Sequence, residues 1–200
     1  QMDVSPFINN TKAVLWNCYN GQVQGTALAE ILMGDVSPSG RLSTTWYDPK
    51  DLEVMKIDGI DQRDDEGIKW ERNDYSIRQR SQKPENFPDG FADKFPGRTY
   101  QYYGGTPVYP FGYGLSYTNF EFKNLRLSKE SADANDDFEV SVDVKNAGTV
   151  PSDEVVQLYV KAPGGDGVNL PLKQLKGFER VSLGAGEEKT VTIKVSVKDL

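Results

Sequence analysis

Apolar and polar residues alternate along most of the chain from Asn119 onward. Alternation with a period of two predicts strands that bury one face and leave the other in water. Such runs occur at 120–127, 138–144, 155–160 and 191–197. The first of them contains a slip in the alternation at Lys123 and Asn124.

Short segments rich in Gly and Pro separate these runs and predict turns. They lie at 146–148, 163–167 and 184–186. Short strands with one polar face indicate an antiparallel β-sandwich. We count about five strands, whereas a sandwich of this kind uses roughly seven, so we expect the last strands to be missing.

The first fifty residues follow a different pattern. Residues 13–19 are a continuous apolar run broken only by Asn17, which is typical of a strand covered on both faces. Residues 22–33 carry apolar positions near helical spacing, and Gly34 follows where a helix favours a left-handed residue. Residues 41–47 predict a second strand. A helix between two strands indicates a parallel α/β crossover, which needs sheet neighbours that we do not find in this chain.

Residues 49–98 have neither period. They hold twelve acidic and ten basic side chains, and prolines interrupt any long element. We predict a loop-like segment that is held mainly where Trp70, Phe91 and Phe95 find apolar partners. The segment has too few apolar side chains to offset the conformational entropy lost on ordering fifty residues.

Composition excludes several functions. The net charge of −7 and the lack of a basic stripe argue against nucleic acid as a partner. No apolar run approaches the roughly 18–20 residues of a membrane helix. The chain has no histidine, which removes Ser-His and Cys-His catalysis and the commonest metal ligand, and we predict neither metal nor cofactor. Cys18 is the single cysteine and lies in the apolar run, so we expect a buried, inert thiol.

Few residues are candidates for chemistry. The acidic cluster Asp64-Asp65-Glu66 is more consistent with a solvated loop than with a pair of facing catalytic carboxylates. Asp35 and Arg41 flank a Ser-Pro-Ser-Gly turn, and we expect a structural ion pair between them rather than catalysis.

Aromatic side chains concentrate at residues 100–117. Around Phe111, Tyr113 and Tyr117, prolines and glycines let the chain turn tightly, so these rings are expected to fill a junction between two domains. For Arg98, Tyr100 and Tyr102 two readings stay open, because the preceding loop could fold back over a neighbouring site. These three are our candidates for residues that line a substrate site, since aromatic faces can stack on the rings of a ligand.

Two motifs are similar to those of a known family. Residues 34–42 (GDVSPSGRL) and 109–118 (YPFGYGLSYT) resemble the C-terminal end of family 3 glycoside hydrolases. Residues 97–103 (GRTYQYY) resemble the β-xylosidase branch of that family. Residues 119–200 resemble its fibronectin type III-like domain, on the residues 146–148 (NAG) and 175–181 (LKGFERV).

The resemblance implies a retaining exo-β-glycosidase that removes terminal β-linked sugars from oligosaccharides, with a β-glucosidase or an α-L-arabinofuranosidase as the alternative within the family. It also implies that the nucleophile and the acid/base lie upstream, so we expect no catalytic residue in this chain. The expected partners are the N-terminal barrel and the rest of the α/β domain. The family favours secretion or a periplasmic location. A stand-alone sandwich that binds carbohydrate or protein is the alternative from another class.

The expected organisation has four parts. Residues 1–48 end an α/β sandwich domain, 49–98 form a charged insertion, 99–118 form the aromatic junction, and 119–200 form an incomplete fibronectin type III-like sandwich.

Overall fold

The computed structural model describes residues 5–8, 10–51, 99–163 and 170–200. The chain divides into two compact units. Unit 1 comprises 1–10, 44–111 and 162–172, and unit 2 comprises 11–43, 112–161 and 173–200. The loop predicted at 49–98 lies outside the described residues from 52 onward, and so do Asp64-Asp65-Glu66, Trp70, Phe91, Phe95 and Arg98.

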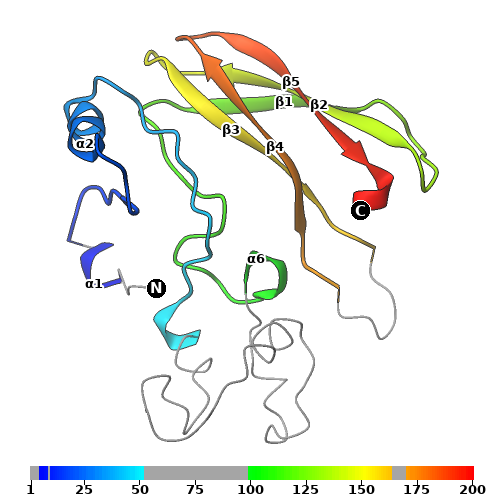
Figure 1. Ribbon diagram of the computed structural model, residues 1–200, viewed down its shortest axis with the longest axis horizontal. Coiled ribbons are helices and arrows are strands. Elements are labelled where there is room, and N and C mark those ends of the chain that lie inside the picture. Colours follow the sequence, from blue (N-terminus) through cyan, green and yellow to red (C-terminus); the bar gives the residue numbers. More distant parts are fainter. Residues whose placement is uncertain (1–4, 9, 52–98, 164–169) are drawn as a thin grey trace, which may run out of the picture. The chain divides into compact units, whose positions relative to one another are not determined.

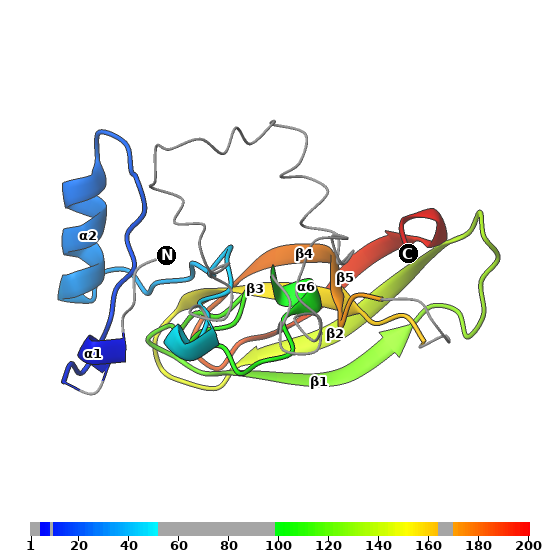
Figure 2. The ribbon, with the colours of Figure 1, turned by 90° about the horizontal axis from the view of Figure 1, so that it is seen from below.

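A β-sandwich forms most of unit 2, as the alternating pattern predicts. Its strands are β1 (Phe120–Leu127), β2 (Asp137–Asn146), β3 (Ser152–Val160), β4 (Gln174–Leu183) and β5 (Glu188–Ser196). All strand pairs are antiparallel, in one sheet of order β1-β2-β5 and another of order β3-β4. Figure 1 shows the two sheets crossing, and Figure 2 shows them as two layers.

The sandwich core takes residues from both sheets. Val144 and Val191 of the first sheet pack with Val156 and Leu183 of the second. The predicted slip in the first strand is confirmed, because the pairing of β1 with β2 shifts register between Lys123 and Arg126 and Asn124 has a φ of +53°. The turn between β4 and β5 also lies at the predicted Gly184–Gly186.

The described helices are short. They are α1 (Ser5–Ile8), α2 (Gln24–Met33), α6 (Thr99–Tyr102) and the 3-10 turn η1 (Val197–Asp199). Helix α2 corresponds to the helix predicted at 22–33, and Gly34 ends it in the predicted left-handed conformation with a φ of +85°. No described helix has the length and apolar character to cross a membrane.

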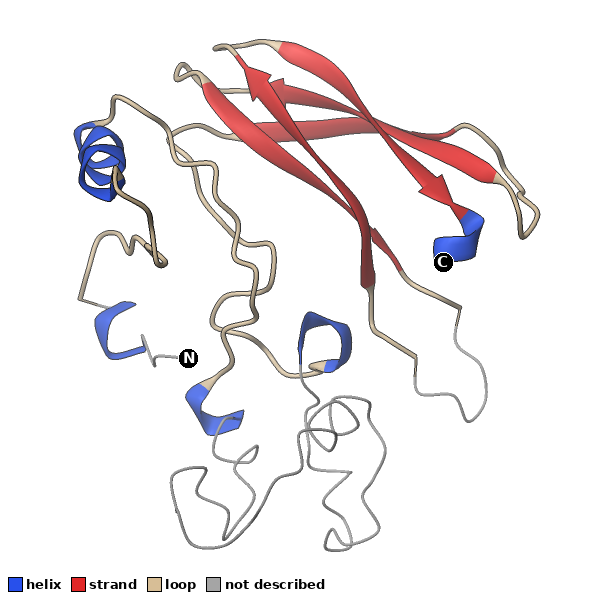
Figure 3. Ribbon diagram, in the orientation of Figure 1, coloured by secondary structure: helices blue, strands red, loops and turns tan. Residues whose placement is uncertain are grey.

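The strands predicted on either side of α2 do not form. Residues 13–19 have no strand, and Figure 3 shows them as loop. Within 41–47 only Trp46 makes a bridge, with Tyr109. A fully apolar run is typical of a strand whose two faces are both covered, and here Val14, Leu15 and Trp16 are exposed. Cys18 is exposed for the same reason, so the prediction of a buried thiol was wrong.

Candidate functional site

Among the described residues of unit 1, three pairs of aromatic rings are in contact. Tyr100 stacks on Phe111 with ring centroids 4.2 Å apart and planes 21° apart. Trp46 and Tyr109 meet edge to face at 5.8 Å, and their backbones are bonded, with the Trp46 amide donating to the Tyr109 carbonyl at 2.8 Å. The ring of Phe111 therefore covers one face of the candidate Tyr100. Such a stacked pair is as compatible with a packed interior as with the lining of a sugar site.

Tyr103 is buried and forms the third pair with Tyr47. Its ring meets that of Tyr47 edge to face at 4.9 Å, and its hydroxyl donates to a carboxylate oxygen of Asp51. Burial, reinforced by this hydrogen bond, raises the pKa of Tyr103 to about 12. The group is thus a fixed hydrogen-bond donor and not a base at neutral pH.

Two further features lie close in sequence to these pairs. The candidate Tyr102 is half-buried at the end of α6, whose Gln101 carbonyl accepts a hydrogen bond of 2.6 Å from the Leu172 amide. Thr45 is buried, and its hydroxyl has no hydrogen-bond partner among the described residues.

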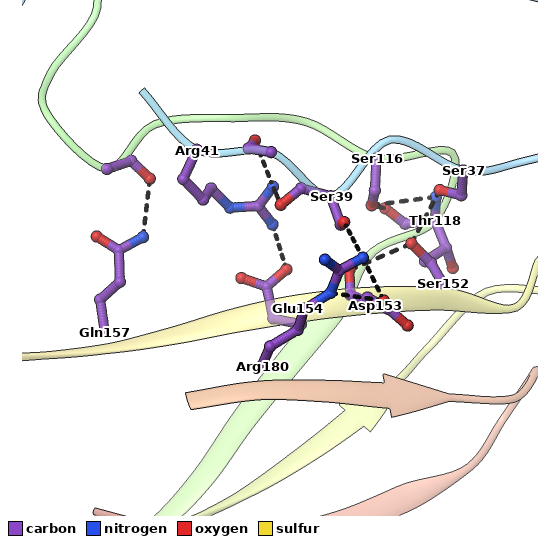
Figure 4. Close-up of polar contacts among 12 residues, drawn as sticks. Ser37, Ser39, Arg41, Ser116, Thr118, Ser152, Asp153, Glu154, Gln157 and Arg180 are labelled. Atoms are coloured by element: carbon purple, nitrogen blue, oxygen red, sulfur yellow. Dashed lines mark hydrogen bonds and ion pairs between the residues drawn. The ribbon is translucent and has the colours of Figure 1, made fainter. Parts of the chain in front are cut away.

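A polar network in unit 2 is centred on Arg41 (Figure 4). The guanidinium donates to the carboxylate of Glu154 on β3, and both side chains are nearly buried, with exposed fractions of 11% and 10%. It also donates to the Ser39 and Gly40 carbonyls. The expected ion pair of Arg41 with Asp35 is therefore corrected. The turn at 37–40 directs the guanidinium to β3, while the Asp35 amide completes the end of α2 by donating to the Glu30 carbonyl at 2.8 Å.

Burial dominates the electrostatics of Glu154. It raises the pKa of this carboxyl above its ordinary value, and the charge of Arg41 and its hydrogen bond only partly oppose the shift. The pair thus illustrates the cost of removing two charges from water, which their attraction only partly offsets.

A second set of contacts joins the same segment to the sandwich. Arg180 on β4 donates to Asp153 at 2.7 Å and to the Ser39 hydroxyl at 3.0 Å. Hydrogen bonds from Ser182 and then from Arg180 hold the pKa of Asp153 below its ordinary value. Ser152 donates to the Ser37 hydroxyl at 2.8 Å.

The aromatic motif contributes to unit 2 through its backbone and through Tyr117. The Tyr117 hydroxyl donates to the Ile31 carbonyl of α2 at 2.6 Å, and its amide donates to the Ser37 hydroxyl at 3.0 Å. The Tyr113 carbonyl accepts from the Leu42 amide at 2.8 Å. Of the residues expected at a junction, Arg41, Tyr113 and Tyr117 thus each make contacts within unit 2, whereas Phe111 belongs to unit 1.

Two glycines of this motif permit the close approach. Gly112 has a φ of +80°, and a Cβ there would lie 2.1 Å from Oε1 of Gln157, the residue whose amide nitrogen donates to the Gly112 carbonyl at 3.0 Å. A Cβ on Gly114 would lie 2.3 Å from the Gly40 carbonyl oxygen. Only glycine fits positions where the backbone needs a positive φ or touches another chain segment.

Asn146 anchors the next turn. It is fully buried, and its side-chain amide donates to the Val150 carbonyl at 2.9 Å and accepts from the Thr118 hydroxyl at 2.5 Å. It also accepts from the Gly148 amide at 3.0 Å. The Asn-Ala-Gly triplet is therefore a structural device that fixes the β2–β3 connection.

The contacts of this polar network are suited to holding chain segments together and not to transferring protons. Both carboxylates of the network, Asp153 and Glu154, are engaged by arginines. Among the described residues no group of three potential ligands could hold a metal ion. Sequence reasoning missed Glu154, although one signal was present: this carboxylate, next to Asp153, lies directly before the apolar run of β3.

Comparisons with known proteins agree with the two motifs. The model of the glycosyl hydrolase family 3 C-terminal domain matches residues 1–117, and that of the fibronectin type III-like domain matches residues 154–200. A thermostable beta-glucosidase B of Acetivibrio thermocellus is 38% identical over 195 residues, covering 94% of this chain and 22% of that protein. A beta-xylosidase of Formosa agariphila is 34% identical over 199 residues, covering 100% and 23%.

Solved structures give the same result. Beta-glucosidase 3B from Thermotoga neapolitana in complex with glycerol aligns with a TM-score of 0.62 at 30% identity, covering 90% of this chain and 22% of that one. A beta-glucosidase of Chaetomella raphigera aligns with a TM-score of 0.63 at 33% identity, covering 90% and 24%. The chain thus spans roughly a fifth to a quarter of the length of these proteins.

Proposed function

The chain belongs to glycosyl hydrolase family 3, and from that premise we propose that it is the non-catalytic C-terminal region of a longer retaining exo-β-glycosidase of the β-xylosidase type. The longer enzyme removes terminal β-linked sugars from plant-type oligosaccharides through a covalent glycosyl-enzyme. The nucleophile and the acid/base come from the part of the protein that precedes this chain.

The observation that carries the β-xylosidase assignment is similarity along the whole chain to an enzyme of that activity. The Formosa agariphila beta-xylosidase matches 100% of this chain. A xylan 1,4-beta-xylosidase of Xylanibacter ruminicola is 32% identical over 198 residues. The segment 97–103, which suggested this branch, adds to that support.

β-Glucosidase activity is the second candidate, and a specific observation favours it. The relative with the highest identity among those named is the Acetivibrio thermocellus beta-glucosidase, and the aligned solved structures are also beta-glucosidases. A glucosidase site must accommodate the hydroxymethyl group that xylose lacks. The choice therefore depends on a pocket in the preceding part of the enzyme.

Within this enzyme the present chain braces the catalytic domains. Arg41, Tyr113 and Tyr117 hold the end of the α/β segment in unit 2, and Phe111 with its Tyr100 partner does so in unit 1. Asp35 contributes through the turn after α2. The exposed apolar residues of 13–19 and α2 dock on the rest of the α/β domain, where the run 13–19 gains its sheet neighbours.

Arg98, Tyr100 and Tyr102 are proposed to line the entrance to the sugar site. Tyr100, which stacks on Phe111, and the half-buried Tyr102 are the aromatic side chains of this proposal that lie within the described residues. In this proposal the four segments 1–48, 49–98, 99–118 and 119–200 correspond to the end of the α/β domain, the insertion, the junction and the sandwich.

The deciding experiment is steady-state kinetics of the full-length protein on aryl β-xyloside, aryl β-glucoside and aryl α-L-arabinofuranoside. The β-xylosidase proposal expects the highest kcat/KM on the xyloside. A preference for the glucoside would select the second candidate, and no hydrolysis of any of the three would overturn both. Tyr102→Ala is expected to raise KM for the preferred glycoside, with Phe178→Ala, an exposed aromatic residue of β4, as the control.

A further inference from the structure

The turn ahead of α2 contains a pair of residues with a chemistry of its own. Asn20 is followed by Gly21, and this is the one place in the 200 residues where glycine follows asparagine. Asparagine is among the residues that are labile to heat. The backbone nitrogen after an asparagine can attack the carbonyl carbon of its side chain, because the new bond closes a five-membered ring. Glycine favours this attack, since it has no side chain to hinder the nitrogen and its backbone is unusually free.

The structure leaves both reacting groups accessible. Asn20 and Gly21 are exposed and lie outside any helix or strand, and Figure 3 shows the chain ahead of α2 as loop. Among the backbone hydrogen bonds of the described residues, none has the Gly21 amide as its donor. The Asn20 carboxamide donates a hydrogen bond to the side chain of Asn17, and both side chains are exposed. Such a contact restrains the carboxamide weakly, because water replaces it at little net cost.

Two other asparagines show how this fold protects a carboxamide. Asn146 is fully buried, and its side-chain nitrogen donates to the Val150 carbonyl at 2.9 Å. Asn124 donates to Asp143 at 3.0 Å, and a leucine follows it in the chain. A buried, hydrogen-bonded carboxamide is held in place, and a bulky next residue hinders the approach of its own backbone nitrogen. Asn20 has neither form of protection.

We propose that Asn20 is a site of spontaneous deamidation in this protein. The Gly21 nitrogen bonds to the side-chain carbonyl carbon of Asn20, and the bond from that carbon to the side-chain nitrogen breaks. The side-chain nitrogen leaves as ammonia and takes up the proton that the Gly21 nitrogen loses. Water then opens the resulting succinimide ring at either of its carbonyls, which gives aspartate or isoaspartate. The reaction consumes only water, so it is independent of the proposed glycosidase activity.

The products change the beginning of α2. Either product adds a negative charge to the turn, because a carboxylate replaces a neutral carboxamide. Isoaspartate also lengthens the backbone by one methylene group, directly before Gly21, whose carbonyl accepts from the Gln24 amide at 3.1 Å. The end of α2 keeps the hydrogen bond of 2.6 Å from the Tyr117 hydroxyl to the Ile31 carbonyl. We therefore expect isoaspartate to loosen the beginning of the helix and to leave its end attached.

The test follows Asn20 while the full-length protein is incubated at neutral pH and physiological temperature. Mass spectrometry of its peptides measures the gain of about one dalton, and chromatography separates the aspartate and isoaspartate forms. A free peptide of residues 17–24 gives the reference rate. Asn20 in the protein is expected to react within about tenfold of the peptide rate, because exposed loops open at almost no cost in free energy. Asn146 is expected to stay unmodified over the same time.

Gly21→Val is the discriminating variant. A Cβ at this position meets nothing within 4 Å, so the chain has room for the new side chain, whereas its branched carbon hinders the attacking nitrogen. We expect the rate to fall at least about tenfold. Asn20→Gln is a second variant that keeps the amide but would have to close a larger ring, and we expect no product there. Gln22→Ala, an exposed neighbour, is the matched control and should leave the rate unchanged.

Two results would overturn the inference. One is a rate at Asn20 in the full-length protein more than about tenfold below that of the peptide, because the folded protein would then protect this turn. The other is an equal rate in the natural protein and in Gly21→Val, because the attack would then not come from the Gly21 nitrogen. Hydrolysis of aryl glycosides by the unmodified protein tests the proposed function separately.

Discussion

At the scale of single residues, the pair of Arg41 and Glu154 joins positions 113 residues apart in the sequence. Sequence spacing pointed to Asp35 because it is close in the chain, and no periodicity reports a contact at such separation. Ion pairs that are nearly buried are sensitive to the loss of one partner, since the remaining charge stays out of water.

Glu154→Ala is therefore expected to lower the free energy of unfolding of the 200-residue chain by about 3–5 kcal/mol, because Arg41 keeps its charge without a partner. Urea unfolding measures the change. Glu121→Ala is the control, since Glu121 and Lys123 form an exposed pair at 2.6 Å that is expected to contribute at most about 1 kcal/mol. Equal losses for the two variants would contradict the assignment of Arg41 and Glu154 as a buried pair.

Substitution of two glycines distinguishes the stability cost of a left-handed backbone from the cost of a steric clash. Gly34 and Gly112 both have positive φ, but a Cβ on Gly34 meets nothing within 4 Å, whereas one on Gly112 meets Gln157 and Tyr159. Gly34→Ala is expected to cost about 1–2 kcal/mol for the left-handed backbone alone. Gly112→Ala is expected to cost about 1–3 kcal/mol more, because the added methyl group would press on Gln157 and Tyr159.

Thermal unfolding of the two variants in the 200-residue chain checks this difference. Gly21→Ala, where a Cβ also meets nothing within 4 Å, is the neutral reference. A smaller loss for Gly112→Ala than for Gly34→Ala would show that Gln157 and Tyr159 move aside without cost.

At the scale of elements, Asp143 is the common acceptor of several hydrogen bonds on the polar face of the first sheet. Its carboxylate accepts two hydrogen bonds from Arg126, at 2.8 and 2.7 Å, and one each from Asn124 and Thr190. The hydrogen bonds from Arg126, followed by those from Thr190 and Asn124, hold the pKa of Asp143 far below its ordinary value. The bulge at Asn124 thus belongs to a contact that links β1, β2 and β5.

This lowered pKa predicts a pH dependence. Asp143 stays ionised in the folded chain where the unfolded chain binds a proton, so its contribution is present above the ordinary pKa of about 4 and is lost as the pH falls below it. The difference in unfolding free energy between the natural chain and Asp143→Asn is therefore expected to shrink from pH 5 to pH 2, or thereabouts. Urea unfolding across this range measures it.

Glu154→Gln provides a comparison of opposite sign. Burial raises the pKa of Glu154, so the folded chain binds its proton more tightly, and its contribution is greatest below the ordinary pKa and declines as the pH rises through the raised one. The natural chain should lose stability relative to Glu154→Gln with rising pH. Parallel slopes for the two variants would contradict both assignments.

Elements differ in how far sequence alone predicts them. The strands β2, β3 and β5 were predictable because one face of each is buried within this chain, and the alternation records that burial. Strand β4 was not among the predicted runs. The cap at Gly34 was predictable because it depends on local backbone only. The runs at 13–19 and 41–47 do not form strands; under the proposed function, their apolar pattern is set by neighbouring strands outside this chain. The apolar pattern of β1 likewise exceeds what this chain covers.

At the scale of the whole molecule, we expect the 200-residue chain to have no glycosidase activity. Loss of the nucleophile and of the acid/base removes the route to a glycosyl-enzyme. Incubation of the purified chain with an aryl β-xyloside measures nitrophenol release. Release that disappears on substitution of one carboxylate of this chain would place an active site here.

The bracing role predicts how the complete enzyme responds to a change at Phe111. Phe111→Ala removes the stack on Tyr100 and half-buried apolar area, and we expect a loss of about 1–3 kcal/mol and a lower melting temperature. KM should change little. A normal melting temperature together with a large rise in KM would instead indicate that the ring contacts the substrate.

Neither unit is a continuous piece of the sequence. The chain passes from one unit to the other after residues 10, 43, 111, 161 and 172, so each unit is assembled from three segments. One proteolytic nick between residues 52 and 98 would therefore release neither unit, because other segments of both remain on each side of the cut. For the same reason, gene shuffling could not transplant either unit as a single cassette, and the two are expected to be inherited together.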